Sequence, residues 1–222
     1  MDLPPPTFRV GGIVLCGGRS SRMGRPKLAL PFGPELMLQR VVRLLAQVVS
    51  PIVVVAAPEQ ELPPLSGEVL IARDELEGRG PLQGLLAGLS AIAPLADAAY
   101  ATSCDVPLLV PGFVRHMLSR LDENEIAVPV EGEFHHPLAA IYRPRVAGHI
   151  AELLAVKQLR PVYLYDRART CRVPVDELRQ VDPDLATLRN LNRPADYLAA
   201  LAQAGFTADP GMIAALGAPH SE

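Results

Sequence analysis

The 222-residue sequence has few cysteines and no long apolar run, and each scarcity excludes a class of protein. Its three cysteines, Cys16, Cys104 and Cys171, lie far apart and form no CxxC pair. An odd number of dispersed cysteines is typical of reduced thiols in a cytosolic protein, and it disfavours a disulfide framework or a zinc site. No apolar run approaches the ~18 residues needed to span a bilayer, and the first residues lack the pattern of a signal peptide. We therefore expect a cytoplasmic protein.

Charge of one sign is also scarce. A net charge of −3 gives the chain no general attraction to nucleic acid or to an acidic membrane, so a bound polyanion needs a local basic patch. The apolar content of 49% favours a packed globular fold. No convincing linker divides the chain. We expect one domain over residues 8–204, followed by a C-terminal tail over 205–222.

Short apolar runs alternate with helical patterns along much of the chain. Strands are expected at residues 9–15, 52–56, 68–72, 98–103 and 126–130, with a further strand at 137–142. Helices are expected at residues 35–49, 81–92, 113–121, 144–156 and 194–204. This alternation predicts the α/β class, with a doubly wound, mostly parallel sheet and helices on both faces.

A glycine-rich loop follows the first predicted strand. Its sequence, LCGGRSSRMGRPK, covers residues 15–27. Gly17 and Gly18 allow the backbone to turn sharply and to approach a ligand without an intervening Cβ. Successive backbone N–H groups in such a loop can form an anion-binding concavity. Because open α/β sheets bind ligands at the carboxyl ends of their strands, this position favours a phosphate-binding loop.

The same loop is strongly basic. Its four cations within nine residues are Arg19, Arg22, Arg25 and Lys27, and no Asp or Glu occurs between Asp2 and Glu35. Arginine offers forked donors to phosphate oxygens, and lysine offers a compact charge, which together suit a triphosphate. The loop matches neither the GxxxxGK[ST] P-loop nor the GxGxxG dinucleotide fingerprint. The alternative is a solvated basic loop, which its place after the first strand disfavours.

The loop resembles the LxGGxSxRMGxxK signature of molybdenum cofactor guanylyltransferases, the MobA family of the nucleotidyltransferase superfamily. The resemblance extends from about Val10 to Leu201. It implies a Rossmann-like nucleotidyltransferase fold, with a nucleotide-binding N-terminal half and an acceptor-binding C-terminal half. The nucleotide contacts that it implies in this loop are Leu15, Cys16, Gly17, Gly18, Arg22 and Lys27. Cys16 stands where the family usually has Ala, and Pro26 where many members have Asp; neither change removes a phosphate ligand.

Asp105 is the predicted metal ligand. It lies in the segment TSCDVPL, residues 102–108, at the end of a predicted strand. Mg²⁺ prefers hard oxygen ligands and usually takes one or two carboxylates together with phosphate oxygens. The family's CDxPxL motif places its metal-binding Asp at this position, so the resemblance implies that Asp105 binds Mg²⁺ and contacts the nucleotide. The alternative is a carboxylate that caps the turn before Pro107.

Asp74 ends the third predicted strand and matches a family Asp that contacts the nucleotide. The segment GPLQG, residues 80–84, matches the family's GPLxG, and the N-terminus of the helix that it opens could face the nucleotide. The alternative for Asp74 is a helix-capping or loop carboxylate. Guanylyl members carry an Asn after the second strand. This chain has Ala56 or Ala57 there, so that contact is expected to be missing.

Two further residues are candidates for the acceptor side. The segment NLNRPAD, residues 190–196, resembles the family's NxNTPED, which implies that Asn192 supplies an oxygen near the metal or the acceptor phosphate. Asn192 serves equally well as the cap of a helix that begins with Pro194. His136 matches a His-Pro position near the acceptor pterin, and we expect acceptor or surface contact from it. His135 and His136 point in different directions on a strand, which disfavours a shared metal.

The resemblance implies transfer of GMP from GTP to the phosphate of molybdopterin, with release of pyrophosphate. Arg22 and Lys27 would bind the triphosphate and Asp105 the Mg²⁺, as the catalytic residues. The implied partners are GTP and molybdopterin, with transient contact to molybdenum cofactor biosynthesis or acceptor proteins. Three alternatives stay open: a cytidylyltransferase, which Gly17 and Met23 disfavour; another small-molecule nucleotidyltransferase; and a catalytically silent GTP-binding partner protein.

Overall fold

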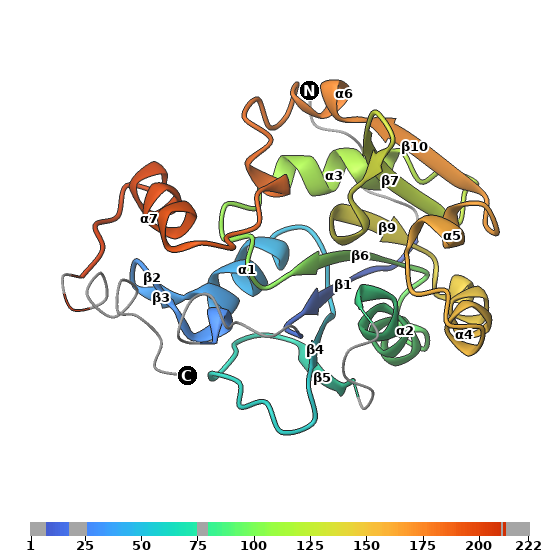
Figure 1. The fold of residues 1–222 in the computed structure, drawn as a ribbon, viewed down its shortest axis with the longest axis horizontal. Helices are drawn as coiled ribbons and strands as arrows, with labels where there is room; N and C mark the ends of the chain where they lie inside the picture. The colour runs from blue at the N-terminus through green and yellow to red at the C-terminus, as the bar shows by residue number, and fades with distance from the viewer. Residues whose placement is uncertain (1–7, 18–25, 75–79, 210, 212–222) are drawn as a thin grey trace.

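An eight-stranded sheet forms the centre of the computed structural model, which describes residues 8–17, 26–74, 80–209 and 211. The strand order is β10-β7-β9-β6-β1-β4-β5, with β8 paired to β7 (Figure 1). The strands are β1 (Val10–Leu15), β4 (Ile52–Ala56), β5 (Val69–Arg73), β6 (Ala98–Ser103), β7 (Ile126–Glu131), β8 (Phe134–His135), β9 (Ala140–Tyr142) and β10 (Thr170–Pro174). The pairs made by β8 and β9 are antiparallel, and the other pairs are parallel. The predicted mostly parallel sheet is confirmed.

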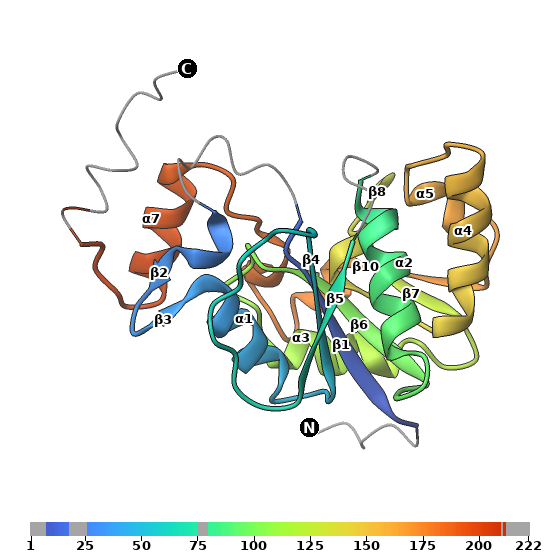
Figure 2. The same ribbon diagram turned by 90° about the horizontal axis from the view of Figure 1, so that it is seen from below.

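Helices cover both faces of this sheet (Figures 1 and 2). They are α1 (Met37–Leu45), α2 (Pro81–Ile92), α3 (Pro111–Ser119), α4 (Ala147–Ala155), α5 (Val162–Tyr165), α6 (Val175–Leu178) and α7 (Pro194–Gln203). Short 3-10 turns span Lys27–Ala29, Pro137–Ala139, Pro144–Val146 and Ala186–Leu188, and β2 (Pro31–Phe32) pairs with β3 (Glu35–Leu36). Among the described residues, no helix has both the length and the apolar character needed to cross a membrane.

The two faces of the sheet carry separate buried clusters. Val14 of β1 packs with α1 and α3 in one cluster, and its neighbour Ile13 packs with α2 and α4 in the other. This alternation follows from the two-residue period of a strand, and it explains why the covered strands are continuously apolar. Helix α2 approaches β1 closely, since a Cβ at Gly88 would lie only 2.5 Å from Cγ2 of Ile13. The close packing places the first turn of α2 beside the carboxyl end of β1.

A third apolar cluster joins α7 to the β2–β3 pair. The ring of Phe32 meets those of Tyr197 and Phe206 edge-on, at centroid distances of 6.3 and 6.0 Å. The Tyr197 hydroxyl donates a hydrogen bond to the carbonyl of Pro31, and the guanidinium of Arg40 lies 4.9 Å above the Phe32 ring. Phe206 belongs to the range predicted as a tail. The cluster anchors the segment before α7 next to the segment that follows the basic loop.

Two sequence predictions differ from the structure. The helix predicted at 35–49 is shorter at both ends: Glu35–Leu36 forms β3, the Gln39 side chain accepts a hydrogen bond from the Leu36 N–H at 2.9 Å, and residues 46–48 form turns after Leu45. The strand predicted at 137–142 is a 3-10 turn followed by the short β9. Strand β10 was not predicted. It lies at the end of the sheet and buries only Val173 fully, so it lacks the apolar signal of a covered strand.

Candidate active site

Four neighbouring parallel strands end at one edge of the sheet, and the predicted nucleotide-site residues follow them. In spatial order the strands are β6, β1, β4 and β5. Asp105 lies two residues after β6, Gly17 two residues after β1, and Asp74 directly after β5. The edge therefore collects residues from distant parts of the sequence at the place where an open α/β sheet binds its ligands.

Part of the predicted phosphate loop lies outside the described residues. The predicted residues concerned are Gly18, Arg19, Arg22 and Arg25. Leu15 and Cys16 are buried at the end of β1, and Gly17 is exposed. Among the described residues, a Cβ at Gly17 would meet no atom within 4 Å. The described start of the loop thus leaves open space above its backbone.

Lys27 joins two oxygen-bearing side chains at this edge. Its Nζ atom donates hydrogen bonds to Oδ2 of Asp105 at 2.8 Å and to Oδ1 of Asn192 at 2.7 Å. The Lys27 and Asp105 side chains are 17% and 10% exposed, so this ion pair is largely shielded from water. The structure therefore brings together three residues that the sequence named separately.

The Asp105 carboxylate is oriented by neutral donors. Its Oδ1 accepts hydrogen bonds from the Ser103 hydroxyl and from Nδ2 of Asn190, the latter at 2.8 Å. Its backbone carbonyl accepts from the Leu191 N–H at 3.0 Å. These contacts turn Oδ2 toward Lys27 and favour the binding-site interpretation of Asp105 over a turn cap. Sequence reasoning missed Ser103 and Asn190, although Asn190 is the first residue of the NLN segment.

The oxygen atoms around Lys27 also suit a divalent cation. Oδ2 of Asp105 and Oδ1 of Asn192 already converge on one cationic group, the Lys27 ammonium. In the described part of the chain, no group of three or more His, Cys, Asp or Glu side chains gathers to hold a metal ion. Magnesium commonly binds through so few protein ligands, because substrate phosphates supply the others. The donor set fits a magnesium-type ion shared with a nucleotide.

Asp74 lies at the other end of the edge. Its backbone N–H donates to the carbonyl of Ala56 at 2.9 Å, and a Cβ at Gly84 would lie 3.9 Å from its Oδ2. The first turn of α2 therefore packs beside this carboxylate. Gly80, the residue before the helix, has a φ of 69°, which favours glycine. Three strand spacings of about 4.8 Å each separate β5 from β6, so Asp74 stands apart from the Lys27 cluster.

Gln60 occupies the region where the sequence suggested a missing contact. Its Oε1 accepts a hydrogen bond from the Ala57 N–H, and its Nε2 donates to the Cys16 carbonyl, both at 3.1 Å. Nη1 of Arg73 donates to the carbonyls of Ala57 and Gln60, at 2.8 Å each. The loop after β4 is thus tied both to the start of the phosphate loop and to the end of β5. No motif in the sequence pointed to Gln60.

Two thiols lie beneath the edge. Cys16 and Cys104 follow the adjacent strands β1 and β6 and are buried in the same cluster, with 4% and 6% exposure. The hydrogen-bonded thiol of Cys104, together with burial, raises the pKa of the Cys16 thiol well above its ordinary value. Cys16 is therefore a protonated, apolar-like group near neutral pH, where the family usually has Ala.

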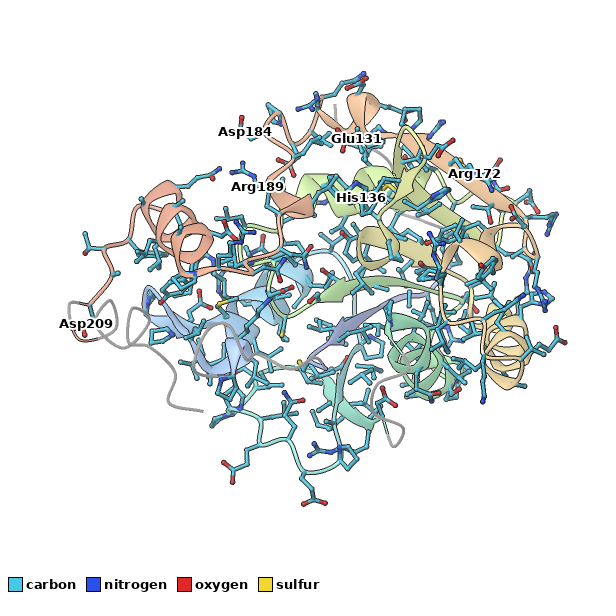
Figure 3. All side chains as sticks on the ribbon, in the orientation of Figure 1. Glu131, His136, Arg172, Asp184, Arg189 and Asp209 are labelled. Carbon is cyan, nitrogen blue, oxygen red and sulfur yellow. The ribbon has the colours of Figure 1, made fainter. Side chains whose placement is uncertain are left out.

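His136 directly follows β8, the second strand of the β7–β8 hairpin. It lies near Glu131 and far from Asp209 (Figure 3). Its ring meets that of Phe134 edge-on at 4.8 Å, while His135 instead stacks on Tyr165 at 4.8 Å. The Nε2 atom of His136 is buried without a hydrogen-bond partner among the described residues, and burial lowers the pKa of the ring. The two adjacent histidines therefore contact different elements. Acceptor contact by His136 stays a prediction.

The fold and the edge together define a nucleotide-binding α/β protein with a shielded cation, a carboxylate and an amide oxygen at the ligand position. The family described as the MobA-like NTP transferase domain matches residues 12–170. The chain belongs to this family and is a nucleotidyltransferase.

Individual relatives agree with that assignment. A protein of Mycobacterium avium, named a probable molybdenum cofactor guanylyltransferase, is 39% identical over 207 residues, covering 89% of this chain and 98% of its own. The crystal structure of molybdopterin-guanine dinucleotide biosynthesis protein A from Archaeoglobus fulgidus has a TM-score of 0.72 at 20% identity, covering 88% and 98%. A Mycobacterium tuberculosis protein solved as a complex with manganese has a TM-score of 0.54 at 19% identity, covering 76% and 89%. The two structures support the fold.

Proposed function

We propose that this protein transfers GMP from GTP to the phosphate of molybdopterin and releases pyrophosphate. The cluster of Lys27, Asp105 and Asn192 carries the proposal, because it combines phosphate-binding charge with hard oxygen ligands at the nucleotide edge. Relatives named as probable molybdenum cofactor guanylyltransferases match this chain over nearly their whole length. Their names support GTP as the donor substrate and molybdopterin as the acceptor.

Each residue of the cluster has a distinct part in the proposed reaction. Lys27, with Arg22 of the basic loop, binds the triphosphate, and Asp105 with Asn192 holds a divalent cation. The chemistry supplied by Mg²⁺ or Mn²⁺ bound there is neutralisation of charge on the α-phosphate and on the leaving pyrophosphate. The attacking oxygen of molybdopterin is already anionic, so no protein base has to remove a proton. Catalysis then consists of positioning and charge stabilisation.

The order of the strands suggests how the substrates lie. Phosphates at Lys27 and Asp105 occupy the β6–β1 end of the edge, and the nucleoside extends toward Asp74 after β5. The acceptor then approaches from the C-terminal half, which carries Asn192 and His136. In this proposal residues 8–204 act as one nucleotidyltransferase domain, with 205–222 as a tail. Transient contact with proteins that supply or accept the cofactor belongs to the same proposal.

Pyrophosphate release tests the function directly. Purified protein is supplied with molybdopterin, either Mg²⁺ or Mn²⁺, and GTP, CTP or ATP in parallel. We expect release that requires molybdopterin and is fastest with GTP. Faster release with CTP would overturn the guanylyl assignment but keep nucleotidyl transfer. GTP binding without release under every condition would instead indicate a silent GTP-binding protein.

A further inference from the structure

The two oxygen atoms of the Asp105 carboxylate have different surroundings. Oδ1 accepts hydrogen bonds from the Ser103 hydroxyl and from Nδ2 of Asn190, whereas Oδ2 accepts one from the Lys27 ammonium. A carboxylate oxygen carries two lone pairs, so the two neutral donors occupy Oδ1 fully. Oδ2 is therefore the oxygen that a bound cation can reach without breaking a hydrogen bond from a neutral donor.

The backbone holds both donors of Oδ1 in place. Ser103 is the last residue of β6, and its Cα pairs with that of Leu15 in β1. Asn190 precedes Leu191, whose N–H donates to the Asp105 carbonyl at 3.0 Å and whose side chain is buried. The Asp105 side chain is only 10% exposed, so few water molecules can replace a lost donor. Displacing either donor is therefore unfavourable, by roughly ten-fold or more in an equilibrium constant, because a hydrogen bond to a charged group is lost.

Divalent cations differ in how they use a carboxylate. Ca²⁺ takes about six to eight oxygen ligands in a flexible arrangement, and it can bind both oxygens of one carboxylate. Mg²⁺ requires near-octahedral geometry, and the two oxygens of one carboxylate lie too close together to fill two octahedral positions. A carboxylate with one saturated oxygen therefore loses nothing toward Mg²⁺. To bind Ca²⁺ through both oxygens, the same carboxylate has to give up a hydrogen bond.

We propose that Ser103 and Asn190 are positioning residues that make the site prefer Mg²⁺-type cations to Ca²⁺, because they leave only Oδ2 of Asp105 to a cation. This inference rests on the proposed nucleotidyl transfer and adds to it the side chains that set the cation preference. Neither residue touches the cation, and both act through the Asp105 carboxylate. Removal of both donors frees Oδ1 and raises the affinity for Ca²⁺ relative to that for Mg²⁺.

The test measures binding of α,β-methylene-GTP, which cannot release pyrophosphate, to the whole protein in saturating Mg²⁺ and in saturating Ca²⁺. Calorimetry gives both Kd values, and their ratio is the readout, because a general weakening of nucleotide binding changes both values alike. We expect the parental protein to bind the nucleotide more tightly with Mg²⁺. In the double variant Ser103→Ala, Asn190→Ala, the ratio should shift toward Ca²⁺ by roughly ten-fold or more. Each single variant should shift it less.

A conservative variant and a matched control separate this role from a structural one. Ser103→Thr keeps the hydroxyl donor and should keep the parental ratio. Ser50 provides the control, because its hydroxyl also donates to a carboxylate, Oε2 of Glu68 at 3.0 Å, but before β4 and so at the opposite edge of the sheet. Ser50→Ala should therefore keep the parental ratio as well.

The outcomes distinguish this inference from the function on which it rests. A parental protein that binds the nucleotide with neither cation would refute the proposed function. Nucleotide binding without a parental preference for Mg²⁺, or with a ratio that the double variant leaves unshifted, would refute the role of Ser103 and Asn190 alone. If the double variant does not fold, an unshifted ratio in both single variants has the same meaning.

Discussion

Replacement of Lys27 by alanine should change GTP affinity and metal affinity in opposite directions. The Lys27 ammonium lies at the point on which Asp105 and Asn192 direct their oxygens, 2.8 and 2.7 Å away. GTP loses a charge-assisted hydrogen bond to phosphate worth about 1.5 to 3 kcal/mol, which corresponds to a rise in Kd of roughly 10- to 150-fold. A divalent cation without nucleotide should bind more tightly, because the ammonium no longer competes for Asp105.

The same substitution should destabilise the fold only moderately. Exposed ion pairs contribute about 0 to 1 kcal/mol, and loss of one partner of a fully buried pair costs about 3 to 5 kcal/mol. The Lys27–Asp105 pair lies between these limits, with side-chain exposures of 17% and 10%. Asp105 also keeps its hydrogen bonds from Ser103 and Asn190. We expect a loss of about 1 to 3 kcal/mol, or a fall in Tm of roughly 2 to 12 °C.

Three measurements on Lys27→Ala check these expectations. Calorimetry gives the GTP affinity with Mg²⁺, the electron paramagnetic resonance signal of free Mn²⁺ gives the affinity for metal alone, and thermal unfolding gives Tm. Lys157→Ala is the control, because Lys157 is an exposed lysine after α4. Equal GTP affinities would remove Lys27 from the nucleotide site. A parallel loss of Mn²⁺ affinity would show that Lys27 does not compete with the metal.

Three further predictions concern the same edge. Asp105→Asn should lower the rate of pyrophosphate release by at least roughly 100-fold while GTP binding falls less, because the metal acts mainly on charge that develops in the transition state; parental turnover would show that the metal site is misplaced. Gly17→Ala should keep its Tm, since the new methyl group meets no atom of the described residues within 4 Å, yet it should reduce the preference for GTP over CTP in parallel turnover assays. The raised pKa of Cys16 keeps its thiol protonated at pH 8, so maleimide should label the half-buried Cys171 first and Cys16 only after unfolding; equal labelling rates by peptide mapping would contradict this.

The elements that the sequence predicted well are those whose own residues decide the structure. The run IVVVA predicts β4 at its observed bounds, because a strand covered on both faces needs apolar residues throughout. Pro81 likewise marks the first residue of α2. The helix predicted at 35–49 was placed two residues too early at its start, because pairing between Pro31–Phe32 and Glu35–Leu36 overrides its amphipathic pattern there.

Site residues were predictable where a motif carried them and hidden where only contacts between segments define them. Lys27 and Asn192 are 165 residues apart, and no pattern in the sequence states that their side chains meet. Gln60 looks like a loop residue, and its contact with Cys16, 44 residues away, exists only in the folded chain. Ser103 looks like an ordinary strand end, although its partner Asp105 is only two residues away.

The two asparagines of the NLN segment illustrate how packing creates a motif. Leu191 is 3% exposed and packs in the cluster that holds Phe32 and Tyr197, so the residues on either side of it turn to the site. Asn190 then acts as a donor to Oδ1 of Asp105, and Asn192 as an acceptor from Lys27. The Asn190 amide thus orients the Asp105 carboxylate. Oδ1 of Asn192 and Oδ2 of Asp105 together form the pair of oxygens that face the Lys27 ammonium. The spacing of two residues therefore follows from a single core-facing leucine between two site-facing amides, and the packing of α7 against β2 sets the geometry of the proposed metal and phosphate site.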